Sequence, residues 1–369
     1  MKKRTSISAL SKLARACAGP ALFIAGVTAL AACTLERPAD ANESRPELLV
    51  SMPEYCNTPD GMTLDSSGNI IMSCPNYNDP TYPGVLVKID TANKLSLYYP
   101  MPVHPDTKRG CPLGLDFGPD GNLYVCDNQY FTDTASKSRL IRIIIKNGEP
   151  VAAEVVADGL NLANAAKWKG NSVYITDTFF DAPDGLSTSG VYRIELSEME
   201  KGIVHVKHED TDPHLIATFT TVPDHKNATG GANGMVFDSK GNLYVALFGN
   251  GEVYKLTFDD DGKVTSNTLF VKSEKMTCTD GIDCDLTTDE IYITDPEKNA
   301  VHVVSPSGEL KTLWQNGDTD GSDGLLDMPS EPIVRGDELI LANFDMPFAG
   351  VMNTKYDEHH TMSVIKLER

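Results

Sequence analysis

The chain has 369 residues, of which 52 are acidic and 32 are basic, so its formal net charge is −20 at pH 7. Such an acidic surface would repel phosphate backbones, which argues against a nucleic-acid-binding protein. The chain is long enough to bury a large core and no linker divides it, so we expect a single folded domain.

The first residues have the features of an export signal. Lys2, Lys3 and Arg4 precede an apolar run at 21–29, which is shorter than a transmembrane helix usually requires. The run ends in Leu-Ala-Ala-Cys33, which resembles a bacterial lipobox. An ordinary secretory signal cut before Cys33, or an uncleaved anchor, are the alternatives.

The favoured interpretation divides the chain into a lipoprotein signal peptide (1–32), a polar tether (33–46) and a folded domain (47–369). Cys33 would then carry the lipid that attaches the protein to a membrane of the bacterial cell envelope. Thr34 after the cysteine suggests, by resemblance to known lipoproteins, the outer membrane, facing either the periplasm or the surface. The mature chain would hold 27 basic and 52 acidic residues, a net charge of −25.

The remaining sequence repeats one pattern six times. A slot that is usually an acid or an amide is followed by a small residue or proline, a short strand, a turn and a second strand. The residue after the slot recurs at 61, 114, 165, 234, 281 and 332, at intervals of 53, 51, 69, 47 and 51. A period of about 50 residues with several strands per unit is typical of a β-propeller. The slots are Asp60, Leu113, Asn164, Asn233, Asp280 and Glu331.

Each repeat can be divided into four short strands rich in β-branched and aromatic residues. In the second repeat we expect strands near 114–118, 122–127, 138–145 and 151–157, and in the fourth near 234–238, 242–247, 251–257 and 266–271. The sixth repeat supplies only three strands, at 332–334, 338–343 and 361–367. We expect the N-terminal strand 47–51 to complete it, because this closure joins the first blade to the last. The prediction is an all-β, six-bladed propeller.

Two long insertions interrupt the repeats. The first, around 196–230, makes the third repeat about 18 residues longer and holds four of the histidines. The second is the loop at 345–360. Long loops in a compact domain are often binding loops, so a lid role and simple decoration both stay open. None of the histidines falls in a slot, and we expect each to be a surface or loop residue.

Six cysteines follow Cys17 and Cys33, and an oxidising compartment permits disulfide bonds. We expect structural bridges, with the pairing undetermined, although Cys278 and Cys284 are too far apart along an extended strand to bond each other. No spacing indicates a zinc site. The six are Cys56, Cys74, Cys111, Cys126, Cys278 and Cys284.

Four of the slots predict a metal site. The inner strand of each blade begins near the propeller axis, so Asp60, Asn164, Asn233 and Asp280 should converge at one face. Two carboxylates and two amide carbonyls form an all-oxygen set, which is what Ca²⁺ prefers. The alternative is that Asp and Asn before glycine simply form turns. A single copy would be a turn residue, but four copies in register favour a calcium ring.

These motifs resemble those of the gluconolactonase and senescence-marker-protein family, and of its six-bladed relatives diisopropyl fluorophosphatase and paraoxonase. The resemblance covers about residues 47–367. It implies a calcium ion held by Asp60, Asn164, Asn233 and Asp280 at the bottom of the channel. The segment Asp280-Gly-Ile-Asp283-Cys-Asp is similar to the Asp-Gly-Met-Asp-Phe-Asp segment of the fluorophosphatases.

The chain departs from these relatives at two slots and at one residue that follows a slot. Leu113 stands where paraoxonases have a histidine, so their histidine-based mechanism is not expected here. Asp60 is shorter by one methylene than the usual glutamate, and Glu331 could compensate as an additional ligand. Ala165 replaces an acid of the fluorophosphatases. Asp283 is a further candidate for the site, although an orienting or packing role is the simpler interpretation.

The leading hypothesis is a Ca²⁺-dependent hydrolase of lactones or related esters. Calcium would stabilise the developing oxyanion, and Asp280 would act as the base for water or as the nucleophile. The main alternative is a non-catalytic lipoprotein whose propeller binds a ligand or a protein partner, with structural calcium. A strictosidine-synthase-like activity is a third possibility. A hydrolase needs an open, polar pocket above the metal, whereas loops 75–83 and 345–360 plugging the channel would favour a binder.

A second acidic stretch lies between the fifth and sixth repeats. Its spacing, with Asn316, Asp318, Asp320 and Asp327, mimics a calcium-binding loop. No helices are expected beside it, and its first and last residues depart from the pattern. We therefore expect a solvated acidic turn.

Overall fold

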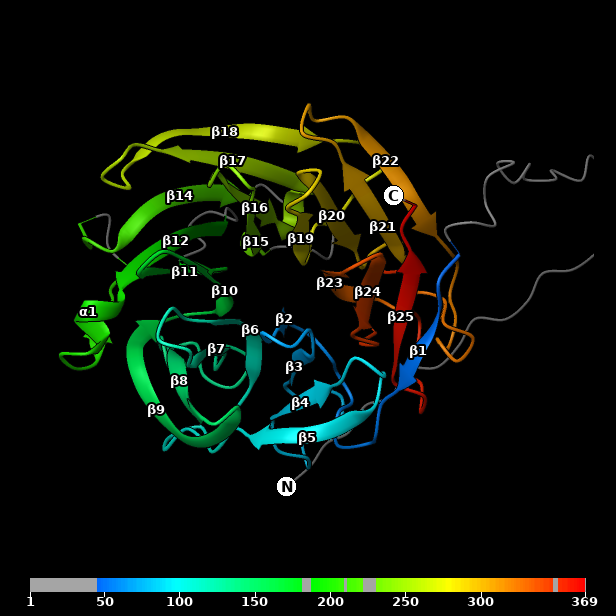
Figure 1. The fold of residues 1–369 in the computed structure, drawn as a ribbon, viewed down its shortest axis with the longest axis horizontal. Coiled ribbons are helices and arrows are strands. Elements are labelled where there is room, and N and C mark those ends of the chain that lie inside the picture. The colour runs from blue at the N-terminus through cyan, green and yellow to red at the C-terminus, as the bar shows by residue number, and fades with distance from the viewer. Residues whose placement is uncertain (1–44, 181–186, 209–210, 222–229, 348–350, 369) are drawn as a thin grey trace, which may run out of the picture. The chain divides into compact units, whose positions relative to one another are not determined.

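The protein is a six-bladed β-propeller. The computed structural model describes residues 45–180, 187–208, 211–221, 230–347 and 351–368. Six antiparallel sheets lie in a ring, with the first strand of each near the centre and the last at the rim (Figure 1). The predicted all-β fold and its blade number are confirmed.

The blades follow one another along the chain, as the repeats predict. Blade one contains β2 (Met62–Leu64), β3 (Ile70–Cys74), β4 (Val85–Ile89) and β5 (Leu95–Pro100). Blade two contains β6 (Pro112–Phe117), β7 (Leu123–Asp127), β8 (Ser138–Lys146) and β9 (Glu149–Leu160). Blade three contains β10 (Ala163–Lys169), β11 (Ser172–Asp177), β12 (Ser187–Glu195) and β14 (Leu215–Thr221). Blade four contains β15 (Ala232–Phe237), β16 (Leu243–Leu247), β17 (Glu252–Phe258) and β18 (Val264–Lys272). Blade five contains β19 (Ile282–Asp285), β20 (Glu290–Asp295), β21 (Ala300–Val304) and β22 (Leu310–Gln315).

The last blade joins the two ends of the described chain. It contains β23 (Pro329–Arg335), β24 (Glu338–Asn343) and β25 (Thr361–Lys366), and β1 (Glu47–Ser51) pairs antiparallel with β25. Figure 1 shows the blue β1 strand beside the red β25 strand at the rim. The predicted closure is confirmed, and it ties the start of the domain to its end through backbone hydrogen bonds.

The described residues of the insertion at 196–230 lie mainly at the outer edge of blades two and three. Helix α1 (Leu196–Met199) follows β12, and β13 (Val204–His205) then pairs in parallel with β9 of blade two as a fifth strand. The segment from 215 is the outer strand of blade three rather than loop. This described part therefore adds to two neighbouring blades, while His225, the last of the four histidines of this insertion, lies outside the described residues.

The core lies between neighbouring blades. The second strand of every blade is the most deeply buried, as in β3, β7 and β16, where all five residues are buried. Between blades six and one, Ile340 packs in the same cluster as Met62 and Ile70. Each such interface removes two apolar sheet faces from water, at roughly 25 cal/mol per Å² of apolar area. The ring is stable because every blade has a partner on both sides.

The predicted disulfide bridges are not present in the structure. All six cysteines of the described domain are free, buried thiols with at most 6% of their surface exposed. They are distributed among the apolar layers, where cysteine packs as a small hydrophobic residue. Burial raises the pKa of the Cys56 thiol well above its usual range, and the neighbouring Cys74 thiol raises it further.

The predicted signal peptide, the lipidated Cys33 and most of the tether lie outside the described residues. Within the described part of the chain, no helix combines the length and the apolar character that crossing a membrane requires.

Candidate metal centre

The predicted ring residues converge on the propeller axis. Asp60, Asn164, Asn233 and Asp280 all line the floor of an open cavity of about 470 Å³. The same four residues and Glu331 also surround a small cavity of about 10 Å³. A space of this size holds about one water-sized sphere. Residues separated by up to 271 positions in the sequence therefore share a space large enough for one ion.

Local irregularities in the inner strands place the slots. In β6, β10, β15 and β23 the pairing register with the second strand shifts at the slot, for instance between Ala163 and Ala166 and between Ala232 and Met235. Such a bulge re-aims a side chain out of the usual strand alternation. In blades one and five the slot lies just before the strand, and the backbone N–H of Asp60 and Asp280 donates to a residue of the second strand. In all six repeats the slot residue therefore lies outside the regular pairing between the first and second strands.

The small residue after the slot is required by close packing at the axis. A β-carbon on Gly281 would lie 2.0 Å from Glu331 Oε2, and one on Gly234 would lie 2.5 Å from the Asp280 carbonyl oxygen. A β-carbon on Gly281 would also lie 2.5 Å from the Ser330 carbonyl oxygen, so at both positions a residue other than glycine would require the backbone to move. The Ser330 hydroxyl contacts the Pro59 carbonyl oxygen at 3.1 Å and closes the ring between blades six and one. Each slot is therefore held against its neighbour.

The carboxylates of the ring have raised pKa values. Burial raises the pKa of Asp60 to about 7. Burial and the charge of Asp60 raise the pKa of Asp280 well above its ordinary range, and a hydrogen bond from Asn233 opposes this shift. Burial also raises the pKa of Glu331, as do the neighbouring carboxylates. Three acids in one desolvated space repel each other, and a cation between them would relieve that repulsion.

Lys167 is a functional residue that the sequence analysis missed. It lines the small cavity, and the charges of Asp116, Glu331 and Asp283 raise its pKa against the effect of burial. Asp116, Lys167 and Asp283 each stand three residues after a slot. In three of the six repeats, the residue three positions after the slot is charged. A comparison of this position among the repeats would have revealed these residues.

The two candidate additional ligands have different surroundings. Glu331 lines the small cavity, where its carboxylate lies beside Gly281 of blade five and its charge interacts with that of Asp60 before the first strand of blade one. Asp283 accepts a hydrogen bond from the Val334 backbone N–H at 2.8 Å and lies near Lys167. It lines neither cavity, and its hydrogen bond joins blade five to blade six. Leu113, the slot without a polar group, contributes to the cavity wall.

The walls of the larger cavity are mainly apolar, which differs from the polar pocket that the sequence-based hypothesis required. Among the described residues that line it, Arg109 is the only basic one, and Thr132 and Thr178 carry the only hydroxyl groups besides Tyr77. Within the described residues, the loops at 75–83 and 345–360 leave this cavity open and contribute Tyr77, Pro80 and Met346 to its wall. The aromatic and methionine lining consists of Tyr77, Phe131, Phe179, Phe248, Phe344, Met328 and Met346.

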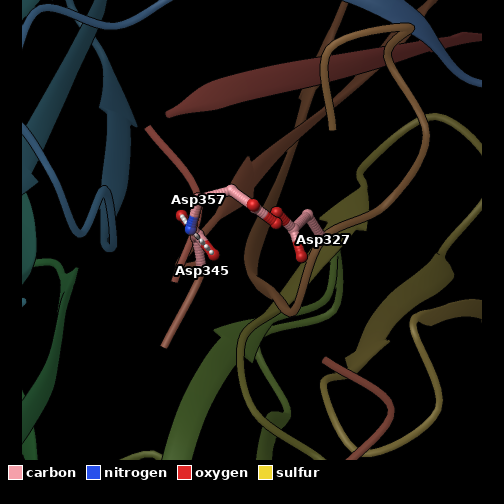
Figure 2. A group of neighbouring side chains, drawn as sticks. All are labelled: Asp327, Asp345 and Asp357. Carbon is pink, nitrogen blue, oxygen red and sulfur yellow. Dashed lines mark hydrogen bonds between the residues drawn. The ribbon is translucent and has the colours of Figure 1, made fainter. Parts of the chain in front are cut away.

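The acidic stretch at 316–327 is not wholly the solvated turn that we expected. Asp318 is exposed and accepts a hydrogen bond from the Thr354 backbone, but Asp327 is only 1% exposed. Its carboxylate faces those of Asp345 and Asp357 (Figure 2). The sequence did not predict this group, because two of its members belong to a different loop.

The ring residues fit a calcium ion by their chemistry. The donor set is made of carboxylate and amide oxygens, the cavity they share has room for one ion, and burial and mutual repulsion raise the pKa of Asp280. Lys167 supplies a single positive charge, which Asp116, Asp283 and Glu331 already share.

The sequence matches no protein-family model and no curated protein. Similar solved structures nevertheless cover most of the chain. One is the gluconolactonase XC5397 from Xanthomonas campestris, with 12% sequence identity, coverage of 89% of this chain and 91% of that chain, and a TM-score of 0.56. Another is regucalcin from Agrobacterium tumefaciens, a calcium-binding protein, with 13% identity, coverage of 88% and 96%, and a TM-score of 0.54.

A luciferin-regenerating enzyme is also similar, with 11% identity, coverage of 88% of this chain and 97% of that chain, and a TM-score of 0.57. The chain shares the six-bladed fold of these proteins. At these identities the likeness shows the fold alone.

Proposed function

We propose that this protein is a calcium-dependent hydrolase of lactones or related esters. One observation carries the proposal: Asp60, Asn164, Asn233 and Asp280 form the floor of an open cavity large enough for a small organic substrate. Similar folds include a gluconolactonase and a calcium-binding regucalcin, which supports the same interpretation.

The residues of the ring have distinct parts in the proposed reaction. Asp60, Asn164, Asn233 and Asp280 would hold the ion, which when bound would polarise the substrate carbonyl and stabilise its developing negative charge. Asp280 would accept the proton of the attacking water, because it lies at the cavity floor and the Asn233 amide fixes its carboxylate. The lining of the cavity would bind the remainder of the substrate and exclude water around it.

The walls narrow the substrate class. Aromatic and methionine side chains line the cavity, and Arg109 is the one charged residue outside the ring among the described residues of its lining. We therefore propose substrates with an aliphatic or aromatic substituent beside the ester bond, rather than polyhydroxylated sugar lactones. The same apolar walls are also compatible with a non-catalytic propeller that binds a ligand. Such a protein would bind calcium but would not hydrolyse these esters.

The first test is the response to calcium. We expect Ca²⁺ at about a thousand times its Kd to stabilise the wild type by about 4 kcal/mol, and the chelator EGTA to remove this effect. Asn233→Ala should lose much of the stabilisation, because it removes one ligand oxygen and the hydrogen bond to Asp280. Thermal unfolding measured with and without EGTA checks this. Equal melting temperatures for the wild type in the two conditions would show that the ring is a set of turns.

We also propose that the chain is attached to the outer membrane of a bacterial envelope through a lipid on Cys33. The lipobox-like segment ending at Cys33 supports this. We expect Cys33→Ala to release the protein from the membrane fraction, and the mass of the wild-type N-terminal peptide to include the lipid. A wild-type N-terminus beginning beyond Cys33 would exclude the anchor.

A further inference from the structure

A group of buried carboxylates lies apart from the ring. Asp327 comes from the loop between β22 and β23, whereas Asp345 and Asp357 come from the loop between β24 and β25. Each offers one oxygen that lies within 4.8 Å of the others. Figure 2 shows the three side chains meeting between the two loops. None of the three lines the cavity that contains the ring.

Asp327 is the decisive member of this group. It is 1% exposed, and neither of its carboxylate oxygens has a hydrogen-bond partner among the described residues. Leaving a carboxylate without a partner in the interior costs several kcal/mol, so buried charges are normally paired or bind a metal. The unpartnered carboxylate points at two further acids, which increases the cost instead of offsetting it.

The other two carboxylates are oriented by their own loop. The Asn353 side-chain amide donates to Asp345 Oδ1 at 3.1 Å, and the Asp357 backbone N–H donates to Asp345 Oδ2 at 3.2 Å. Lys355 Nζ lies 2.6 Å from Asp357 Oδ1, while Asp357 Oδ2 is buried without a partner. One oxygen of Asp357 and both oxygens of Asp327 are therefore unused by the described protein.

The positive charges nearby do not neutralise the group. Lys355 is exposed over 67% of its side chain and contacts only the outer oxygen of Asp357. His360 Nδ1 lies 3.4 Å from Asp345 Oδ2 without a hydrogen bond, and its Nε2 faces the Tyr356 hydroxyl. Neither group reaches Asp327.

We infer that Asp327, Asp345 and Asp357 form a second site for a hard divalent cation, with Ca²⁺ as the preferred ion. The ligand atoms are all oxygens, which favours Ca²⁺ over Zn²⁺. An ion there would join the two loops directly behind the cavity wall, because Met328 follows Asp327 and Asp345 stands between Phe344 and Met346. The inference does not depend on the proposed hydrolase activity.

A shared proton is the competing explanation. Burial and the neighbouring carboxylates raise the pKa of Asp327 to about 9, so without an ion this acid would be protonated at neutral pH. A proton would neutralise one acid, whereas a divalent cation would also use the free oxygen of Asp357. The two explanations differ in the number of calcium ions bound per chain.

Equilibrium dialysis with Ca²⁺ on the EGTA-stripped full chain tests the inference. We expect Asp327→Asn to bind one ion fewer than the wild type, while Asp323→Asn, an exposed residue of the same loop, binds as many. The ring variant Asn233→Ala should keep this ion, which separates the second site from the proposed active site.

Asp357→Asn should also lose the ion, and it is the informative variant if Asp327→Asn does not fold. Wild-type stoichiometry in both Asp327→Asn and Asp357→Asn would overturn the inference in favour of the proton.

Discussion

Replacing Asp280 by asparagine is expected to reduce ester hydrolysis by about 10²–10⁴-fold, the usual contribution of a positioned acid–base group. The asparagine would keep the size of the side chain and one carbonyl oxygen, but it can neither accept a proton from water nor carry the charge that a cation requires. Steady-state kinetics on alkyl and aryl lactones, with saturating Ca²⁺, would measure the change. The loss should appear mainly in kcat, because the cavity walls that bind the substrate are unchanged.

Asp283→Asn is the matched control for this experiment. Asp283 is three residues further along the same segment, and its pKa is also raised by burial. It lines neither cavity, and an asparagine there can still accept the hydrogen bond from the Val334 backbone. We expect its kcat to stay within a few-fold of the wild type. Equal activity of Asp280→Asn and the wild type would remove the basis for the hydrolase, and the non-catalytic binder would then be favoured.

The arrangement of the ring could be predicted from the sequence because the slot recurs with the period of the fold. A propeller places the same position of every repeat at the same height on the axis, so Asp60 and Asp280 had to approach each other although they are 220 positions apart in the sequence. The closure by β1 was predictable for a related reason, since the last repeat lacks a strand. Both conclusions depend on repetition and not on details of packing.

The features that the sequence did not predict depend on contacts between non-equivalent positions. Asp327 meets Asp345 and Asp357 only because two loops of different length fold against each other, and no period relates them. The direction in which Glu331 reaches depends on the missing side chain of Gly281. The apolar cavity walls come from loops whose lengths vary from blade to blade. The free cysteines were mispredicted because the expected compartment permits bridges but does not require them.

Lys167, whose role the sequence did not predict, neutralises carboxylates next to the predicted ring. Among the substitutions proposed here, replacing Lys167 should reduce the free energy of unfolding the most. We expect Lys167→Met to destabilise the protein by up to about 3–5 kcal/mol, because it leaves the half-buried carboxylates of Asp116, Asp283 and Glu331 without their cation. Urea denaturation monitored by fluorescence would measure this free energy of unfolding. Lys169→Met is the control: Lys169 is on the same strand but exposed, lying over the Phe258 ring, and its replacement should cost about 1 kcal/mol or less.

The pH dependence of the Lys167→Met variant provides a second measure of the same effect. Burial raises the pKa values of Asp116, Asp283 and Glu331, and the lost ammonium would no longer oppose that shift. An acid whose pKa is higher in the folded than in the unfolded state costs no stability at low pH and costs more as the pH rises through the unfolded value. The deficit of the variant should therefore be larger at pH 8 than at pH 5, and Glu331→Gln in the same chain should recover part of it. A deficit that is independent of pH and unaffected by Glu331→Gln would mean that Lys167 contributes through packing alone, and that the carboxylates around the axis are neutralised in another way.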